Sequence, residues 1–75
     1  MIKVYTTETC PWCIKVKTYL KTKGIDFQEL NIEKDDEARE EMIKKSNQRG
    51  VPVLDINGSI IIGFDKPAID KAINS

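Results

Sequence analysis

The stretch VYTTETCPWC, residues 4–13, joins a strand pattern to a helix pattern and places two cysteines at the junction. The β-branched and aromatic residues within residues 2–5 predict a strand. A helix is predicted from Pro11 to the residue before Gly24, because proline suits a first helical turn and glycine ends a helix. The apolar positions of this helix recur at helical spacing, at Trp12, Cys13, Val16, Tyr19 and Leu20.

A second strand is expected over residues 25–32. Its apolar residues are Ile25, Phe27, Leu30 and Ile32, and the alternation breaks between Phe27 and Leu30. Two neighbouring strands that are joined through a helix must be parallel, with a right-handed crossover. Residues 2–32 are therefore expected to form a βαβ unit.

A second helix is predicted from Asp35 or Asp36, because either side chain can cap its first turn. Ala38, Met42 and Ile43 recur at helical spacing and are expected to face inward. The side chains expected to face solvent are those of Glu37, Arg39, Glu40, Glu41, Lys44 and Lys45. Such an amphipathic helix is suited to cover one face of a sheet.

The C-terminal part of the sequence predicts a hairpin and a last helix. Residues 51–56 and 59–62 flank Asn57-Gly58, a strong hairpin pattern because both turn residues tolerate positive φ. A helix capped by Asp65 follows, with apolar residues at Ala68, Ile69, Ala72 and Ile73. The order β-α-β-α-β-β-α predicts an α/β fold, in which helices cover a four-stranded mixed sheet.

Length and composition restrict the function. The 75 residues leave room for a single domain over residues 1–75, with a modest core that suffices for a monomer. Twelve Lys and Arg balance twelve Asp and Glu, so no global field favours nucleic acid or an anionic membrane. No run of apolar residues is long enough to span a bilayer, and the N-terminus does not resemble a signal peptide. We therefore expect a cytoplasmic protein.

The two cysteines carry the predicted chemistry, because the chain contains no histidine to act as a base or a metal ligand. A thiolate at a helix N-terminus is stabilised by unpaired N–H groups and the helix dipole, which lowers its pKa from roughly 8.5. Cys10 is therefore predicted to be the nucleophile. Cys13 lies one turn later, where its sulfur can attack a mixed disulfide at Cys10, and is predicted to be the resolving thiol.

Three structural roles compete with redox chemistry for the cysteine pair. A zinc site needs about four ligands, and this chain supplies two cysteines and no histidine, so it would require a second chain. A structural disulfide between Cys10 and Cys13 would close a loop too small to constrain the unfolded chain, and a reducing cytosol would not maintain it. Two cysteines packed in the core would leave the proline and the helix start without a cause. Redox chemistry without a bound metal is the preferred interpretation.

Motifs along the whole chain carry a resemblance to a known family. They are Val4-Tyr5-Thr6, Glu8-Thr9-Cys10-Pro11-Trp12-Cys13, Phe27-Gln28-Glu29-Leu30, Glu40-Glu41-Met42-Ile43-Lys44, Val51-Pro52 and Gly63-Phe64-Asp65. With these motifs the chain resembles a glutaredoxin. The resemblance implies a thioredoxin-like fold, a cis peptide before Pro52 facing the cysteines, and dithiol exchange. It also implies glutathione as the reductant, no bound cofactor, and disulfide-containing or glutathionylated proteins as partners.

The same resemblance implies a glutathione site. Trp12 would cover the bound cysteinyl sulfur, although an aromatic at this position could also belong to the core. Gln48 or Arg49 would meet the glycine carboxylate, unless either is only a solvated loop residue. The backbone of Val51 would pair with the glutathione cysteine, and Asp65 would meet the γ-glutamyl group while also capping a helix. Residues with a structural role beside this site are Pro11, Pro52 and Gly63.

Some positions depart from the glutaredoxin pattern. Gly50 stands where the family commonly has Thr, Ile62-Gly63 where it has a Gly-Gly pair, and Asp65-Lys66 where it has two acids. The ending Gly63-Phe64, followed by Lys66-Pro67, resembles the glutaredoxin-like donors that feed ribonucleotide reductase. Those donors are reduced by thioredoxin reductase. The alternative function is therefore an electron donor of that kind.

Two further kinds of partner correspond to single features of the sequence. Some glutaredoxins bind an iron–sulfur cluster between two chains through the first cysteine, and Pro11 argues against this by the pattern of the family. Lysines that share one predicted helix face form a weak steering patch for an acidic protein partner, with no indication of nucleic acid. Their positions are Lys15, Lys17, Lys21 and Lys23.

Overall fold

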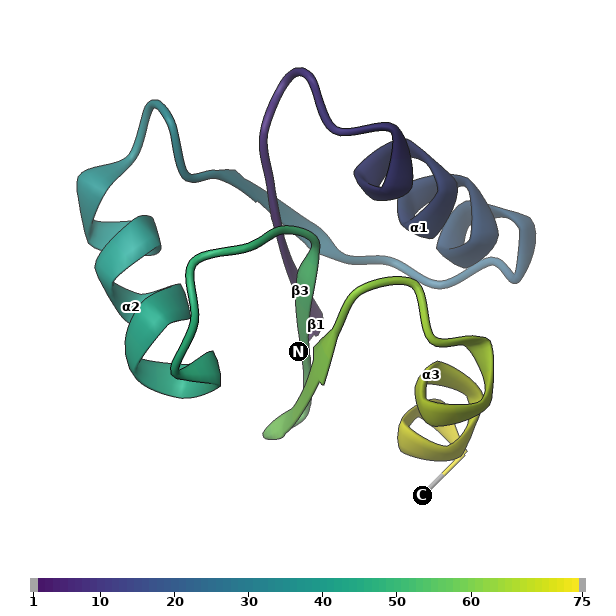
Figure 1. The fold of residues 1–75 in the computed structure, drawn as a ribbon. Helices are drawn as coiled ribbons and strands as arrows, with labels where there is room; N and C mark the ends of the chain where they lie inside the picture. Colours follow the sequence, from purple (N-terminus) through teal and green to yellow (C-terminus); the bar gives the residue numbers. More distant parts are fainter. Residues whose placement is uncertain (1, 75) are drawn as a thin grey trace.

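The computed structural model describes residues 2–74 and arranges them as a mixed sheet between helices (Figure 1). The elements are β1 (Ile2–Thr6), α1 (Pro11–Thr22), β2 (Gln28–Asn31), α2 (Asp36–Ser46), β3 (Val53–Ile56), β4 (Ser59–Ile62) and α3 (Lys66–Ile73). This order confirms the predicted β-α-β-α-β-β-α chain. Among the described residues, α1 and α3 lie on one side of the sheet and α2 on the other (Figure 1).

The sheet has the strand order β2-β1-β3-β4 and combines both strand directions. β1 pairs with β2 in parallel, as expected for two strands joined through a helix. β1 pairs with β3, and β3 with β4, in antiparallel register. The turn between β3 and β4 uses positive φ at Asn57 (52°) and Gly58 (100°), which confirms the hairpin predicted there.

The second strand is shorter than the sequence predicted. β2 begins at Gln28 rather than Ile25, because Gly24 turns the chain at a φ of +71°. The N–H of Ile25 then donates to the carbonyl of Leu20 (3.0 Å) instead of pairing with a strand. Ile25 and Phe27 still pack against the core, so their apolar character serves burial from a loop.

Two other boundaries differ or become definite. The third strand begins at Val53 rather than at residue 51, because Val51 and Pro52 form a cis peptide outside the ladder. Asp35, one of the two predicted caps, accepts a hydrogen bond from the N–H of Ala38 (3.1 Å) and caps α2. Asp65 caps α3 by the same contact to Ala68 (3.3 Å), as predicted.

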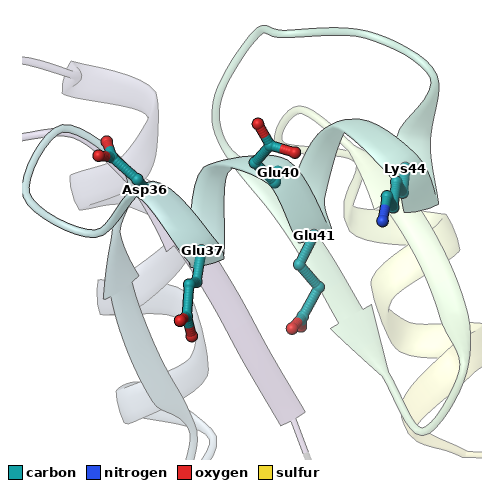
Figure 2. Close-up of a pocket in the computed structure, with 5 residues that line it drawn as sticks. All are labelled: Asp36, Glu37, Glu40, Glu41 and Lys44. Carbon is teal, nitrogen blue, oxygen red and sulfur yellow. The ribbon is translucent and has the colours of Figure 1, made fainter.

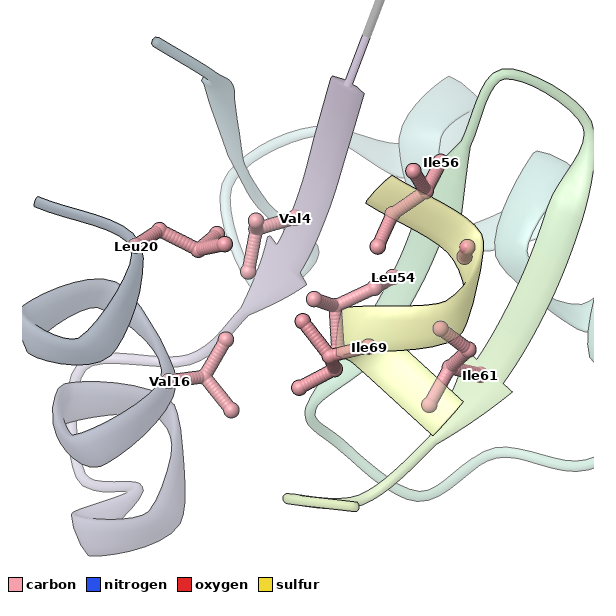
Figure 3. Close-up of a cluster of buried hydrophobic side chains, with 8 residues drawn as sticks. Val4, Val16, Leu20, Leu54, Ile56, Ile61 and Ile69 are labelled. Carbon is pink, nitrogen blue, oxygen red and sulfur yellow. The ribbon is translucent and has the colours of Figure 1, made fainter. Parts of the chain in front are cut away.

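Alternating side chains of the strands build two cores, one on each face of the sheet. The larger core lies between the sheet and the helices α1 and α3 (Figure 3). Its buried members are Val4, Val16, Leu20, Leu54, Ile56, Ile61, Ile69 and Ala72. The smaller core lies under α2, and its buried members are Tyr5, Ile32, Ala38, Met42 and Val53. β1 and β3 contribute buried side chains to both cores, so these strands are fixed from both sides of the sheet.

Candidate active site

Three separate segments meet at one end of the sheet. Tyr5 of β1 pairs with Val53 of β3, so the loop that follows β1 and the loop that precedes β3 leave the same end. Val53 also pairs with Ile62 at the end of β4. The N–H of Gly63, directly after β4, donates to the carbonyl of Pro52, directly before β3 (2.8 Å). This hydrogen bond joins the turn after β4 to the loop before β3. The predicted site residues of the three segments are therefore neighbours, although they are far apart in sequence.

Cys10 occupies the N-cap position of α1, with Pro11 at the first helical turn. The N–H of Cys13 donates to the Sγ atom of Cys10 (3.1 Å). The two cysteines form a disulfide with their Cα atoms 5.2 Å apart. A sulfur at this position, in the reduced state, receives N–H donors and the positive end of the helix dipole, both of which stabilise a thiolate.

The two sulfurs differ in burial. Cys10 is 8% exposed, whereas Cys13 is fully buried at 0% in the first turn of α1. A substrate disulfide in solvent can therefore approach Cys10 but has no direct access to Cys13. This asymmetry is the one that a nucleophile followed by a resolving thiol requires.

Trp12 lies on the surface, which corrects its expected place among the inward apolar positions of α1. Its side chain is 55% exposed, because it belongs to the first turn of α1 at the rim of the sheet. The ring lies 6.4 Å from the ring of Phe64, and the ammonium of Lys15 sits 4.3 Å from the indole centre. The alternative that Trp12 is a core aromatic is therefore wrong, because about half of its surface remains in solvent.

The two candidates for a carboxylate contact, Gln48 and Arg49, differ in their surroundings. The amide of Gln48 accepts the N–H of Gly50 (2.7 Å) and donates to the carbonyl of Gly50 (2.9 Å). It also donates to the hydroxyl of Ser46 (3.3 Å), so this side chain is engaged in its own loop. Arg49 is exposed and lines a small cavity of about 160 Å³ against Arg39 and Glu40 of α2.

The engagement of Gln48 accounts for Gly50, which stands where the family pattern has Thr. A Cβ atom on Gly50 would lie 2.8 Å from the Oε1 atom of Gln48, closer than such atoms approach in proteins. A side chain at position 50 would therefore displace the Gln48 amide from both of its backbone partners. The glycine and the glutamine form one local arrangement directly before the cis Val51-Pro52 peptide.

The remaining predicted residues lie at the same end of the sheet. Val51 is half-buried beside Pro52, and its backbone stands outside the strand ladder. Gly63 adopts a φ of +80°, a conformation that favours glycine, in the turn after β4. Asp65 is exposed at the start of α3, where its role as a helix cap is seen directly.

Acidic side chains elsewhere on the molecule do not form a second reactive site. Within residues 2–74, no three His, Cys, Asp or Glu side chains gather where they could hold a metal ion. None of the helices in this range combines the length and apolar character needed to cross a bilayer. An open hollow of about 530 Å³ lies along α2 and is lined mainly by Asp36, Glu37, Glu40 and Glu41 (Figure 2). Lys44 completes its lining.

A charged network under α2 was not predicted from the sequence, because Glu41 and Lys45 were expected to face solvent. The hydroxyl of Tyr5, which is fully buried, donates to Glu41, and Lys45 contacts both Glu41 (3.0 Å) and Asp55 (2.5 Å). Lys3 also contacts Glu41 (3.1 Å). The hydrogen bond from Tyr5, followed by those from Lys45 and Lys3, lowers the pKa of Glu41 to about 2. The spacing of Glu41 and Lys45 was visible in the sequence, but their cross-element partners were not.

Comparison of the sequence with known proteins gives consistent matches. A family model described as Glutaredoxin matches residues 2–61. An uncharacterized glutaredoxin-like 8.6 kDa protein in the rubredoxin operon of Clostridium pasteurianum is 58% identical over 73 residues, which are 97% of each chain. Glutaredoxin 3 of Escherichia coli K12 is 45% identical over 64 residues, which are 85% of this chain and 77% of that protein.

Solved structures extend the likeness to the fold. The thioredoxin-like protein BC3987 superposes with a TM-score of 0.91 at 29% identity, covering 97% of this chain and 100% of that one. The glutaredoxin-like protein NrdH-redoxin from Escherichia coli, described by its thioredoxin-like activity profile, gives a TM-score of 0.84 at 27% identity. That match covers 93% of this chain and 91% of the other. The predicted thioredoxin-like fold is therefore confirmed.

Proposed function

The chain belongs to the glutaredoxin family and is a thiol-disulfide oxidoreductase, and from this premise we propose that Cys10 and Cys13 are its redox pair and glutathione its reductant. The observation that carries the first part is the position of Cys10 at the N-cap of α1, with Cys13 buried behind it. The proposed substrates are disulfide-containing and glutathionylated proteins.

The proposed reaction has two exchange steps. The Cys10 thiolate attacks one sulfur of the substrate disulfide, and the other substrate sulfur leaves as a thiolate. For a protein disulfide, the Cys13 thiolate then attacks Cys10, closes the Cys10–Cys13 disulfide and releases the reduced substrate. Two molecules of glutathione, oxidised together to one glutathione disulfide, return the pair to its dithiol form. For a glutathionylated protein, Cys10 takes up the glutathionyl group and the protein leaves as a thiolate. One free glutathione then attacks this mixed disulfide, which releases the Cys10 thiolate and glutathione disulfide.

The glutathione site that we propose combines side chains with exposed backbone. Arg49 takes the glycine carboxylate, because no carboxylate within residues 2–74 pairs with its guanidinium, which can bind bidentately, while the amide of Gln48 is held by Gly50. The backbone of Val51 pairs with the cysteinyl residue, and Trp12 covers the sulfur. Asp65 and the first N–H groups of α3 receive the γ-glutamyl group. Gln48 contributes by shaping the loop.

A second candidate function has its own support. NrdH-redoxin shares the fold over most of the chain, and the departures at Ile62 and Lys66 weaken the match to a glutathione site. In this alternative, thioredoxin reductase reduces the protein and ribonucleotide reductase is one acceptor. Both functions use the same cysteine pair, so they differ only in the reductant and the acceptor.

The proposed setting follows from the chemistry of the pair. We place the protein in the cytoplasm, where a reducing environment maintains the dithiol between turnovers. We propose that it acts as a monomer folded as one domain over residues 1–75. A cluster-bound dimer would instead use Cys10 as an iron ligand, and a brown colour after anaerobic purification would reveal it.

The test of the proposed function is NADPH consumption with a glutathione mixed disulfide. Glutathione with glutathione reductase is compared with thioredoxin reductase alone. We expect turnover with glutathione, and we expect Arg49→Ala to raise the KM for glutathione severalfold while leaving kcat unchanged. Lys44→Ala is the matched control, since it removes an exposed cation from α2. Turnover only with thioredoxin reductase would replace the proposal by its alternative.

A further inference from the structure

An apolar surface continues from the cysteines onto the side of the molecule that carries α1 and α3. Trp12 contacts Phe64, and Ile14, two residues further along α1, is 57% exposed. Between the two helices lies a groove of about 340 Å³, whose apolar lining comes from Ile14, Tyr19 and Phe64. We name this hollow the α1–α3 groove. Large apolar side chains exposed together beside a reactive site are typical of a surface that binds a partner.

Lysines supply the charge of the α1–α3 groove. Lys15 and Lys66 are both part of its lining, which contains no carboxylate. The ammonium of Lys66 lies 5.7 Å from the ring centre of Phe64 and 5.4 Å from that of Tyr19. Both lysines are thus held over the aromatic rings that line the groove or adjoin it.

Within the part of the chain that the structure describes, Lys15 and Lys66 have no ion pair, unlike two other lysines in or directly after α1. Lys17 pairs with Glu29 (2.8 Å) and Lys23 pairs with Asp70 (3.3 Å). Over residues 2–74, neither Lys15 nor Lys66 lies within ion-pair distance of a carboxylate. Asp70 is near enough for Lys66 to lower its pKa, after the stronger effects of Tyr19 and Lys23, which bind it directly. The positive charge at the groove is therefore available to another molecule.

We propose that the α1–α3 groove binds an acidic segment of the protein substrate, with an apolar side chain on Ile14 and Phe64 and carboxylates at Lys15 and Lys66. The inference rests on the proposed function and states which protein substrates the enzyme prefers. Charge complementarity favours this occupant, because opposite charges steer association and fix the register of a docked segment. Glutathione does not need the groove, since its carboxylates are assigned to Arg49 and the start of α3.

The test compares two glutathionylated peptides that differ only at the positions flanking the cysteine. One peptide carries glutamate and phenylalanine there, and the other carries lysine and phenylalanine. We expect kcat/KM for the acidic peptide to exceed that for the basic peptide by about tenfold at low salt, with the ratio falling as salt rises. The double variant Lys15→Glu/Lys66→Glu is expected to invert the preference. The ratio of the two kcat/KM values is compared, because both peptides carry the same glutathionyl group and any change at the glutathione site affects them equally.

A matched control changes the net charge equally at other places. Lys44→Glu/Lys71→Glu replaces two exposed lysines outside the α1–α3 groove and is expected to keep the preference for the acidic peptide. Equal turnover of both peptides by the unaltered protein, or inversion by the control variant, would overturn the docking proposal. Glutathionylated mercaptoethanol is a small mixed disulfide without a peptide segment. Failure of the unaltered protein to turn it over would instead overturn the proposed function on which the docking proposal rests.

The apolar half of the groove is tested separately. Ile14→Ser is expected to raise the KM for the acidic peptide about threefold and to leave the small disulfide unaffected. An unchanged KM would remove Ile14 from the proposed surface. Sedimentation of the unaltered protein gives the competing outcome. A concentration-dependent dimer that Ile14→Ser dissociates would show that a second copy covers the groove, and would overturn the proposal.

Discussion

The two faces of the sheet are built from the same strands but stabilised differently. On the face that carries α1 and α3, buried side chains form an apolar core with Val4 and Leu54 near its centre. On the face that carries α2, the buried cluster is smaller and is bordered by hydrogen-bonded charges around Tyr5, Glu41 and Lys45. The face with the larger apolar core also bears the helix that starts at Cys10. A firmly packed helix keeps the N–H groups at its first turn fixed relative to the reacting sulfur.

The same comparison holds for surface charge. α1 carries lysines and no acidic residue, whereas acidic residues dominate the start of α2 and the open hollow along it (Figure 2). The formal net charge of zero conceals this separation. A partner therefore meets different fields on the two sides, and the positive side is the one beside Trp12 and the cysteines.

The largest expected effect concerns the two cysteines. Cys10→Ser is expected to abolish all disulfide exchange, because it removes the thiol of the more exposed of the two cysteines. Cys13→Ser is expected to abolish reduction of protein disulfides while some removal of glutathione from proteins remains. Both are measured by NADPH consumption with each class of substrate. Activity of Cys10→Ser on either substrate would contradict the assignment.

The cores are compared through two valines that are both fully buried, on opposite faces. Val4→Ala removes methyl groups from the larger core and is expected to lower the free energy of unfolding by about 2.5 kcal/mol. Val53→Ala makes the same change under α2 and is expected to cost about 1.5 kcal/mol, because a smaller cluster can close more of the cavity. Urea unfolding measures both. A larger loss for Val53→Ala would reverse the comparison of the two faces.

The charged network makes the α2 face sensitive to acid. Because the pKa of Glu41 is lowered to about 2 in the folded protein, its contribution is fully present above about pH 4.5 and is lost as the pH falls toward 2. The Glu41 side chain is 40% exposed, so solvent screening leaves about 1 kcal/mol of stabilisation. Glu41→Gln should therefore be less stable at pH 7 and match the unaltered protein at pH 2. A constant difference across this range would contradict the account.

The smallest expected effect is at the loop before Pro52. Gly50→Thr is expected to displace the amide of Gln48 and to raise the KM for glutathione about threefold, which corresponds to less than about 1 kcal/mol. Gln48→Ala should produce a similar change, and adding Gly50→Thr to Gln48→Ala should cost little more. Additive effects in the double variant would show that the two residues do not act together.

Much of the fold could be predicted because it depends on local patterns. The hairpin at Asn57-Gly58 was predictable because both residues tolerate positive φ, and the helix start at Pro11 because proline suits a first helical turn. The first residue of β2 could not be predicted from apolar spacing. Ile25 and Phe27 are buried from a loop, and apolar character alone does not distinguish a loop from a strand.

The candidate site was predictable to the extent that its motifs carry chemistry. The positions of Cys10 and Cys13 on α1 followed from the strand-to-helix junction, and their difference in burial agrees with the roles predicted for them. The hydrogen bonds between Gln48 and Gly50 could not be predicted, because the direction of a loop side chain is not revealed by spacing. The inward turn of Glu41 was missed for the same reason, since its partner Tyr5 lies on another element.

The central claim is that the start of α1 makes Cys10 the reactive thiolate. The most direct measurement is alkylation of the fully reduced protein with one equivalent of iodoacetamide at a series of pH values, followed by mass spectrometry of peptides. The account predicts rapid labelling of Cys10 alone at about pH 6, well below the roughly 8.5 at which a free thiol ionises. Labelling of Cys13 first, or of both cysteines only near the pKa of a free thiol, would contradict it.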